Sequence, residues 1–512
     1  MEAPPSHLAA SHKEGEEELK VPPLLTLPES DFPSYGITLQ GIRRFLASHD
    51  PAVLLGRTTE EVCRDPVVGL TTSPPSSYCS VLQRAGSPDV GPATVFVSHA
   101  WRYRLSVVVK ALEHWEEARL QQGMAPSYFW LDLFTNSQHK TADKPFEWWQ
   151  NVFAVNVGRI GHTLLVLQWS DPIPLKRAWC IFELGATLRL GARLEVVMPP
   201  NEAAAFLGSL NVQRYQEVYR ALTSVHVASA EATKPEDAQA ILHTVATWAN
   251  GHEGVDAAVS GAMQRWMLDT AQQALQGLPL PERGASDLLY ETSRLAMRLG
   301  RLQEAEALAR ESLVGRVATF GCSSPPAWGA MSSLGDVLLA RGSLLEEAGA
   351  LFEAVRAANP AHQHAAIFLA RVRLLQGRLD CAQAALAQAE AHNPEGRDVR
   401  SALQLRESLA ALTLARGGEG AAAAAAAQFA SAHQGNVELL GASYPATLGV
   451  RCCLANALSC AGQLAAAEAH FVAVLADQER VLGAEHRDVL ETQMRYSQHR
   501  DRAAQTRQEL DT

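Results

Sequence analysis

The stretch "TVFVSHAW", Thr94 to Trp101, joins a short run of apolar, mostly β-branched residues to a histidine and a tryptophan. The run has the length and composition of a buried β-strand. Similar runs recur down to residue 228, and segments with helical periodicity separate them; the predicted strands cover 94–98, 128–133, 162–169, 194–199 and 225–228. Because alternating strands and helices form a parallel sheet with helices on both faces, the pattern predicts a doubly wound α/β domain of five parallel strands.

A binding site is expected at one edge of this sheet. In doubly wound sheets, ligands bind beyond the carboxyl ends of the strands, at the point where the strand order reverses. For a flavodoxin-like order this point lies between the first and the third strand. The segments "SHAWRY" (98–103) and "SDPIPLKRAWCIFE" (170–183) follow those two strands, so we expect them to face one crevice.

Composition limits the classes of partner. A net charge of −11 and a pI near 5.9 argue against nucleic acid or an anionic membrane, because no basic stripe offsets the acidic excess. The eight cysteines form no CxxC pair, which predicts reduced, buried thiols and neither a metal site nor a disulfide framework. No apolar run reaches the length of a membrane span and no secretory signal opens the chain, so we expect a cytoplasmic protein.

The second half of the chain changes character. It becomes rich in Ala and Leu, and glycines mark the turn between paired helices, spaced 35 to 45 residues apart; they are Gly300, Gly342, Gly377, Gly417 and Gly462. The segment 286–495 resembles tetratricopeptide repeats, which are stacked helix–turn–helix units. The phrases "LGASYPAT" and "LGAEHRDV" are similar to the kinesin light chain subclass of these repeats. The resemblance implies an all-α repeat solenoid that binds a protein partner.

The first half resembles a Toll/interleukin-1 receptor (TIR) domain, in particular the TIR-like modules of algae and other protists. The resemblance covers about residues 60–250 and rests on "SYCSVLQ", "DVGPATVFVSHAWRY", "HTLLVLQW" and "RAWCIFEL". It implies a flavodoxin-like sheet of five parallel strands. In TIR domains that hydrolyse NAD, a glutamate lies four residues after a tryptophan on the helix following the third strand. Trp179 and Glu183 match that spacing.

The resemblance also implies roles for single residues. Glu183 would be the catalytic residue: it would bind the ribose hydroxyls and stabilise the cation that develops as nicotinamide leaves. We expect Trp179 to share one helix face with Glu183 and to wall the same pocket. Further contacts to the nucleotide are expected from the ends of the first two strands, with Arg102 on the pyrophosphate; the residues are His99, Trp101, Arg102, Asp132 and Asn136. NAD would be the substrate, and no cofactor or metal is implied.

Part of the family pattern is missing. After the second strand, many TIR domains have a loop rich in Gly and Asp that serves self-association and contacts the base. This chain has "FTNSQHKTADKPFEWW" (134–149) instead, so those contacts are not transferred to it. Self-association through the TIR-like domain remains an expectation, because in the family two subunits often complete one site.

Two functions stay open at this stage. The first is an NAD-hydrolysing signalling protein whose repeat array binds a protein. The second is a non-enzymatic adaptor, in which Trp179, Cys180 and Leu184 merely pack a helix onto the sheet. A kinesin light chain-like cargo adaptor has less support, since no heptad run precedes the repeats.

The expected order of domains follows from these patterns. We predict a disordered tail, a helical leader, the TIR-like domain, linker helices, the repeat array and a C-terminal tail; their bounds are 1–35, 36–90, 91–250, 251–285, 286–500 and 501–512.

Overall fold

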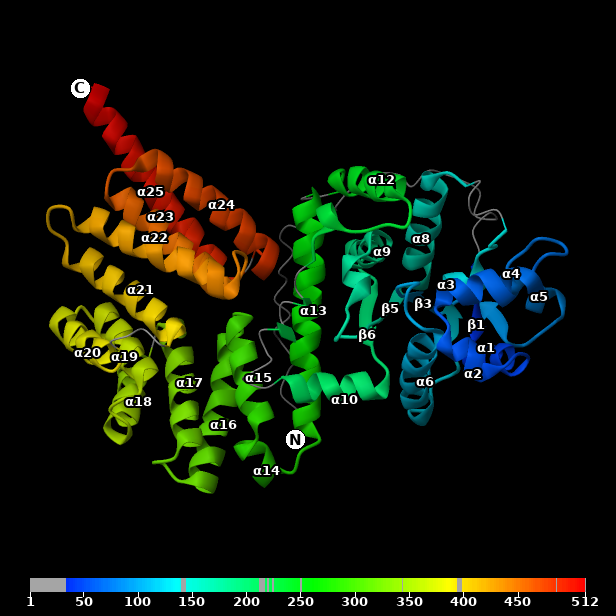
Figure 1. Cartoon of the computed structure of the whole chain (residues 1–512), viewed down its shortest axis with the longest axis horizontal. Helices are drawn as coiled ribbons and strands as arrows, with labels where there is room; N and C mark the ends of the chain where they lie inside the picture. Colours follow the sequence, from blue (N-terminus) through cyan, green and yellow to red (C-terminus); the bar gives the residue numbers. More distant parts are fainter. Residues whose placement is uncertain are drawn as a thin grey trace, which may run out of the picture.

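The computed structural model contains an α/β domain followed by an array of paired helices (Figure 1). It describes residues 34–139, 144–210, 217–218, 221–222, 225–248, 251–342, 344–393, 398–484 and 486–511. The predicted N-terminal tail therefore lies almost entirely outside the described residues, as do positions 140–143 of the loop after the second predicted strand.

Within the described residues, six strands form one mixed sheet in the order β2-β1-β4-β3-β5-β6. The strands are β1 (Tyr35–Thr38), β2 (Val90–Pro92), β3 (Val95–Ser98), β4 (Tyr128–Trp130), β5 (His162–Val166) and β6 (Arg193–Val197). The last four are parallel, in the order β4-β3-β5-β6, whereas β1 pairs antiparallel with both β2 and β4. The strand order thus reverses at β3, between β4 and β5, where the ligand crevice is expected.

One strand prediction is wrong. The segment 225–228, expected as a fifth parallel strand, contains a short 3₁₀ turn, η4 (Val227–Ser229). At this turn the backbone amide of Val227 donates to the side chain of Asp256, at 2.8 Å from Oδ1, and not to a neighbouring strand. The leader 36–90 contains helices, and it also contributes most of β1 and the first residue of β2.

A close backbone contact explains how β1 joins the sheet. A Cβ atom at Gly36 would lie 2.7 Å from the Tyr128 carbonyl carbon and 2.8 Å from the Phe129 oxygen. Only glycine lets β1 approach β4 this closely. The added strand covers the β4 edge, which would otherwise present unpaired backbone groups.

Alternation along β3 divides the domain core into two layers. Phe96 packs into one layer and stacks on Trp130 at 4.8 Å, whereas Val95 and Val97 face the other layer. One face of the sheet is covered by α6 (Leu105–Gln121), with α1 (Leu39–Ala47) and α2 (Pro51–Gly56) beside it. The opposite face is covered by α8 (Phe146–Ile160) and α9 (Ala178–Arg189).

Shorter elements connect these layers. The described ones are α3 (Thr59–Val62), η2 (Cys63–Val67), α4 (Val68–Leu70), α5 (Tyr78–Arg84), α7 (Asp132–Thr135), η3 (Ile173–Lys176), α10 (Pro200–Ser209) and α12 (Pro235–Ala246).

The C-terminal part consists of paired antiparallel helices, as the sequence predicts. The helices are α15 (Asp287–Arg298), α16 (Leu302–Phe320), α17 (Pro325–Arg341), α18 (Leu345–Ala358), α19 (Gln363–Leu375), α20 (Leu379–Ala391), α21 (Val399–Arg416), α22 (Ala421–Leu440), α23 (Pro445–Cys460) and α24 (Leu464–Leu482), followed by α25 (Arg487–Asp511). Each predicted turn glycine follows the first helix of a pair with a positive φ, for example 70° at Gly342. That backbone conformation favours glycine and ends the helix. The helix α25 continues through most of the predicted C-terminal tail.

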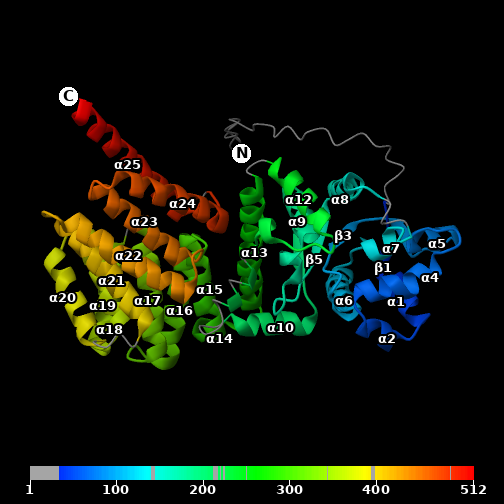
Figure 2. The same ribbon diagram turned by 45° about the horizontal axis from the view of Figure 1, so that its top comes forward.

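A long central helix joins the two halves (Figure 2). This helix, α13 (Gly251–Gln276), packs on α9 of the α/β domain and on α15 and α24 of the array, while α14 (Leu280–Ala285) packs on α16. Gln264 Nε2 donates to the Val481 carbonyl oxygen at 2.8 Å, and His486 Nε2 lies 3.3 Å from the Arg298 carbonyl oxygen. The end of the array therefore returns to its beginning. None of the described helices combines the length and apolarity that crossing a bilayer requires.

Candidate functional site

The end of β3 carries a cluster of polar side chains that the sequence singled out. Trp101 Nε1 donates to Asp132 Oδ2 at 2.6 Å, and His99 Nδ1 lies 3.9 Å from Asp132 Oδ1. The other ring nitrogen of His99 lies 3.1 Å from the Thr59 hydroxyl. Burial lowers the pKa of His99, against the opposing effect of the Asp132 charge, so the imidazole is neutral at neutral pH. The structure thus brings His99, Trp101 and Asp132 together, and their contacts to a nucleotide stay predictions.

Glu183 lies on the other side of β3, inside the core. Its Oε2 atom accepts a 2.6 Å hydrogen bond from the Ser98 hydroxyl, and only 7% of the residue is exposed. Adjacent strand residues point to opposite faces, which is why Ser98 reaches α9 while His99 reaches α3. Burial raises the pKa of Glu183 to about 8, although the Ser98 bond lowers it and the Asp132 charge raises it further. The carboxyl is therefore mostly protonated at neutral pH.

Trp179 does not share a pocket with Glu183. Its ring lies 5.4 Å from that of Phe146 and 5.3 Å from that of Phe153, both on α8. Its Nε1 atom donates to Asp237 Oδ2 on α12 at 3.2 Å. The indole thus packs between helices, whereas the carboxyl of Glu183 bonds to the sheet. The catalytic role of Glu183 and the substrate-binding role of Trp179 stay predictions.

The two remaining predicted residues differ in accessibility. Asn136 is 3% exposed, and its Oδ1 atom has no hydrogen-bond partner among the residues that the structure describes. Arg102 is exposed at the carboxyl edge of the sheet, with its guanidinium 3.8 Å from the Glu231 carboxylate. Of these two side chains, only that of Arg102 lines an open cleft and is accessible to a ligand there.

This cleft has a volume of about 420 Å³ and lies at the predicted edge of the sheet. Its lining comes from the segments that follow β3, β5 and β6, and the charged members are Arg102, Arg104, Lys110, Asp171 and Glu202. Glu183 does not line it. The sequence predicts a crevice at this edge, but of its charged residues only Arg102 was expected to contact a ligand. The second arginine of "WRYR" (101–104) was a usable signal, whereas Asp171 stands in a loop and Glu202 in the first turn of α10, neither of them within a motif.

The repeat array offers a second surface, formed by the first helix of each pair. Successive first helices α15, α17, α19 and α21 pack on one another, which places them on the inner side of the curved array. His364 on α19 lies 3.0 Å from Asp336 on α17, and Arg371 donates to Glu407 on α21 at 2.9 Å. Polar contacts therefore tie neighbouring repeats together along this face.

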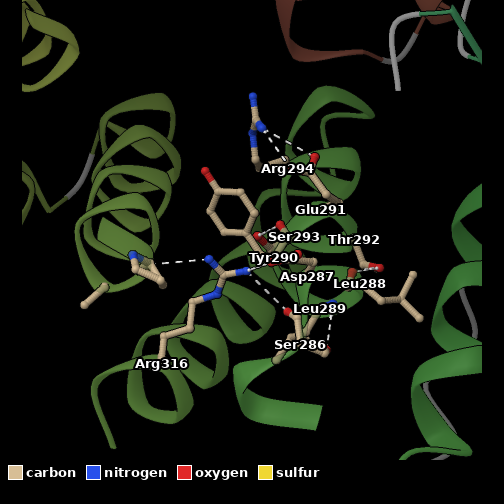
Figure 3. A network of polar contacts seen from close by, with 12 residues as sticks. Ser286, Asp287, Leu288, Leu289, Tyr290, Glu291, Thr292, Ser293, Arg294 and Arg316 are labelled. Atoms are coloured by element: carbon tan, nitrogen blue, oxygen red, sulfur yellow. Dashed lines mark hydrogen bonds and ion pairs between the residues drawn. The ribbon is translucent and has the colours of Figure 1, made fainter. Parts of the chain in front are cut away.

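Tyr290 on α15 stands in a network of arginines (Figure 3). The Arg316 guanidinium lies 4.4 Å from the centre of its ring and donates to Asp287 Oδ1 at 2.7 Å. Arg294 lies 5.5 Å from the same ring and pairs with Glu291 at 3.2 Å. Figure 3 shows the Tyr290 hydroxyl pointing away from Asp287 and Arg316. Burial raises the pKa of this phenol, so it stays a neutral hydrogen-bonding group.

Comparison with known proteins identifies the second half. Family models described as "Tetratricopeptide repeat" match residues 339–405 and 447–488. Residues 339–405 and 447–488 carry tetratricopeptide repeats. No curated protein matches the chain.

Two solved structures are similar to parts of this chain. Putative kinesin light chain nearly identical TPR-like repeats of Podosopora anserina are 23% identical; the match covers 40% of this chain and 98% of that one, with a TM-score of 0.29. A Rap protein complexed with Competence and Sporulation Factor is 11% identical; the match covers 60% of this chain and 97% of that one, with a TM-score of 0.28. The comparisons give the TIR resemblance of the first half no support.

Proposed function

We propose that this chain is an adaptor whose tetratricopeptide repeats hold a segment of a partner protein on their inner face. Tetratricopeptide repeats suggest a protein-binding array, and solenoids of this kind bind along their concave surface. The observation that carries the proposal is a row of half-buried aromatic and arginine side chains on successive first helices.

The members of this row stand on three successive first helices, α15, α17 and α19. On α15, Tyr290 and Arg294 are four residues apart and share one helix face. Trp328 on α17 and Phe368 on α19 are half-buried as well, and Arg371 lies 4.6 Å from the Phe368 ring. Trp, Tyr and Arg contribute most of the binding energy in protein interfaces, because they combine large contact areas with polar tips. Half-buried residues of these types are suited to docking.

The experiment compares inner-face variants with outer-face controls. Trp328→Ala and Phe368→Ala remove inner aromatic rings. Val314→Ala on α16 and Val472→Ala on α24 change side chains that are 71% and 53% exposed on second helices. Proteins captured by the wild type and by both controls, but lost with both inner-face variants, would support the proposal once direct binding to the purified chain is measured. Equal capture by all four variants would overturn it.

Hydrolysis of NAD is a second candidate, and the specific observation in its favour is the cleft between the segments after β3 and β5, which Arg102 lines. The reaction would require Glu183 to leave Ser98 and lose its proton, since burial raises its pKa to about 8. Self-association through the α/β domain could supply that rearrangement. Nicotinamide release by concentrated wild-type protein, lost in a folded Glu183→Gln variant, would support this activity; absence of release from the wild type would exclude it.

A further inference from the structure

Positive and negative side chains lie on different walls of the cleft at the carboxyl edge of the sheet. Arg102, Arg104 and Lys110 all follow β3 and supply the cationic side, while Asp171 follows β5 and Glu202 follows β6. Arg104 and Lys110 have no carboxylate partner within 4.0 Å among the described residues, and both are exposed. Two cations on the same wall are thus available to an anionic ligand.

The floor of the cleft is held in place by one buried side chain. Tyr103 is 2% exposed, and its hydroxyl donates to the Asp171 carbonyl oxygen at 2.8 Å. The same hydroxyl accepts from the Gln168 amide at 3.2 Å. Tyr103 therefore joins the loop after β3 to the loop after β5. A cleft whose walls are fixed before binding loses less conformational entropy when a ligand enters.

The wall that carries Asp171 and Glu202 limits which class of ligand can bind in the cleft. Ser170 donates to Glu202 Oε2 at 3.2 Å, which orients this carboxylate beside the cleft. Carboxylates only accept hydrogen bonds, so this wall suits hydroxyl groups and repels a second anion. Arginine and lysine on the opposite wall suit a phosphate. The volume of about 420 Å³ lies within the range of small-molecule sites, about 300 to 1,000 Å³.

We propose that this cleft binds a sugar phosphate, with the phosphate on Arg104 and Lys110 and the sugar hydroxyls on Asp171 and Glu202. The proposal is independent of protein binding by the repeats. It is also independent of Glu183, which lies in the core outside the lining of the cleft.

The test is calorimetric titration of the full-length chain with ribose 5-phosphate, inorganic phosphate and ribose. Ribose 5-phosphate is expected to bind more tightly than either fragment. The double variant Arg104→Gln/Lys110→Gln should weaken its binding at least about tenfold, because it removes both charge-assisted contacts to the phosphate. Arg507→Gln, an exposed site on the distant α25, is the matched control and should leave binding unchanged.

A second variant separates the two halves of the ligand. Glu202→Gln should weaken ribose 5-phosphate binding while leaving binding of inorganic phosphate unchanged or stronger. Thermal melting of each variant shows whether it is folded. No saturable binding of ribose 5-phosphate up to about 10 mM would overturn the proposal, as would equal binding by the wild type and the double variant.

Discussion

The Ser98 hydroxyl donates to Glu183 Oε2 over 2.6 Å and joins the end of β3 to the middle of α9 inside the core. This bond gives the carboxyl a structural role that is independent of any catalysis. A buried carboxyl that keeps its proton avoids the large cost of placing an unpaired charge in the interior.

Stability is expected to fall as pH rises because of this group. Burial raises the pKa of Glu183 from its ordinary value of 4.5 to about 8, so between these values the folded state holds a proton that the unfolded state has lost. Its contribution is fully present below pH 4.5 and is lost as pH rises toward 8, by up to about 1.4 kcal/mol per pH unit. Urea unfolding of Glu183→Gln should show a smaller loss of stability between pH 5.5 and 7.5 than that of the wild type. The same loss in both proteins would contradict this account.

Removing the other partner should destabilise the fold. Ser98→Ala leaves a buried carboxyl oxygen without its donor, at a cost of roughly 1–3 kcal/mol. A thermodynamic cycle of Ser98→Ala, Glu183→Leu and the double variant measures the coupling between the two sites, because leucine cannot accept the hydrogen bond. Additive effects of the two changes would show that the hydrogen bond contributes nothing.

The added strand β1 depends on Gly36. In Gly36→Ala the new Cβ atom would lie 2.7 Å from backbone of Tyr128, which cannot move without breaking the β1–β4 pairing. We expect a loss of about 1–3 kcal/mol in the free energy of unfolding. Gly56→Ala is the control, because no atom lies within 4 Å of its new Cβ. Equal stability of the two variants would contradict the role assigned to Gly36.

A second pair of glycine substitutions tests whether the start of the array depends on the packing of α14 on α16. In Gly315→Ala on α16, the new Cβ would lie 2.2 Å from the carbonyl carbon of Gly284, so α14 would have to separate from the array. Gly449→Ala on α23 meets no atom within 4 Å and should stabilise its helix by about 0.5–1 kcal/mol. Thermal melting should therefore move in opposite directions for these two mid-helix substitutions. A rise for both would mean that α14 does not need this contact.

The sequence predicts most of the sheet, because β3 to β6 are short segments rich in apolar residues, most of which are buried. It misses β1, since "YGIT" is short and contains a glycine whose purpose appears only in the approach to β4. It wrongly predicts a strand at 225–228, because strand-like composition does not reveal that Asp256, far along the chain, captures the Val227 amide. Tertiary contacts decide both cases.

The site shows the same limit. A spacing of four residues puts Trp179 and Glu183 on one side of α9. That side of the helix packs against other helices as well as against the sheet. The indole turns to α8 and α12, and the carboxyl turns to β3. Spacing predicts a shared face, whereas packing decides which neighbour each side chain contacts.

The most direct test of the central claim is the affinity of one captured partner for purified wild-type chain, for Trp328→Ala and for the outer-face control Val314→Ala. Binding on the inner face predicts that Trp328→Ala weakens the complex by at least about 2 kcal/mol, roughly thirtyfold, while Val314→Ala binds as the wild type does. Equal affinity of all three folded proteins would contradict it.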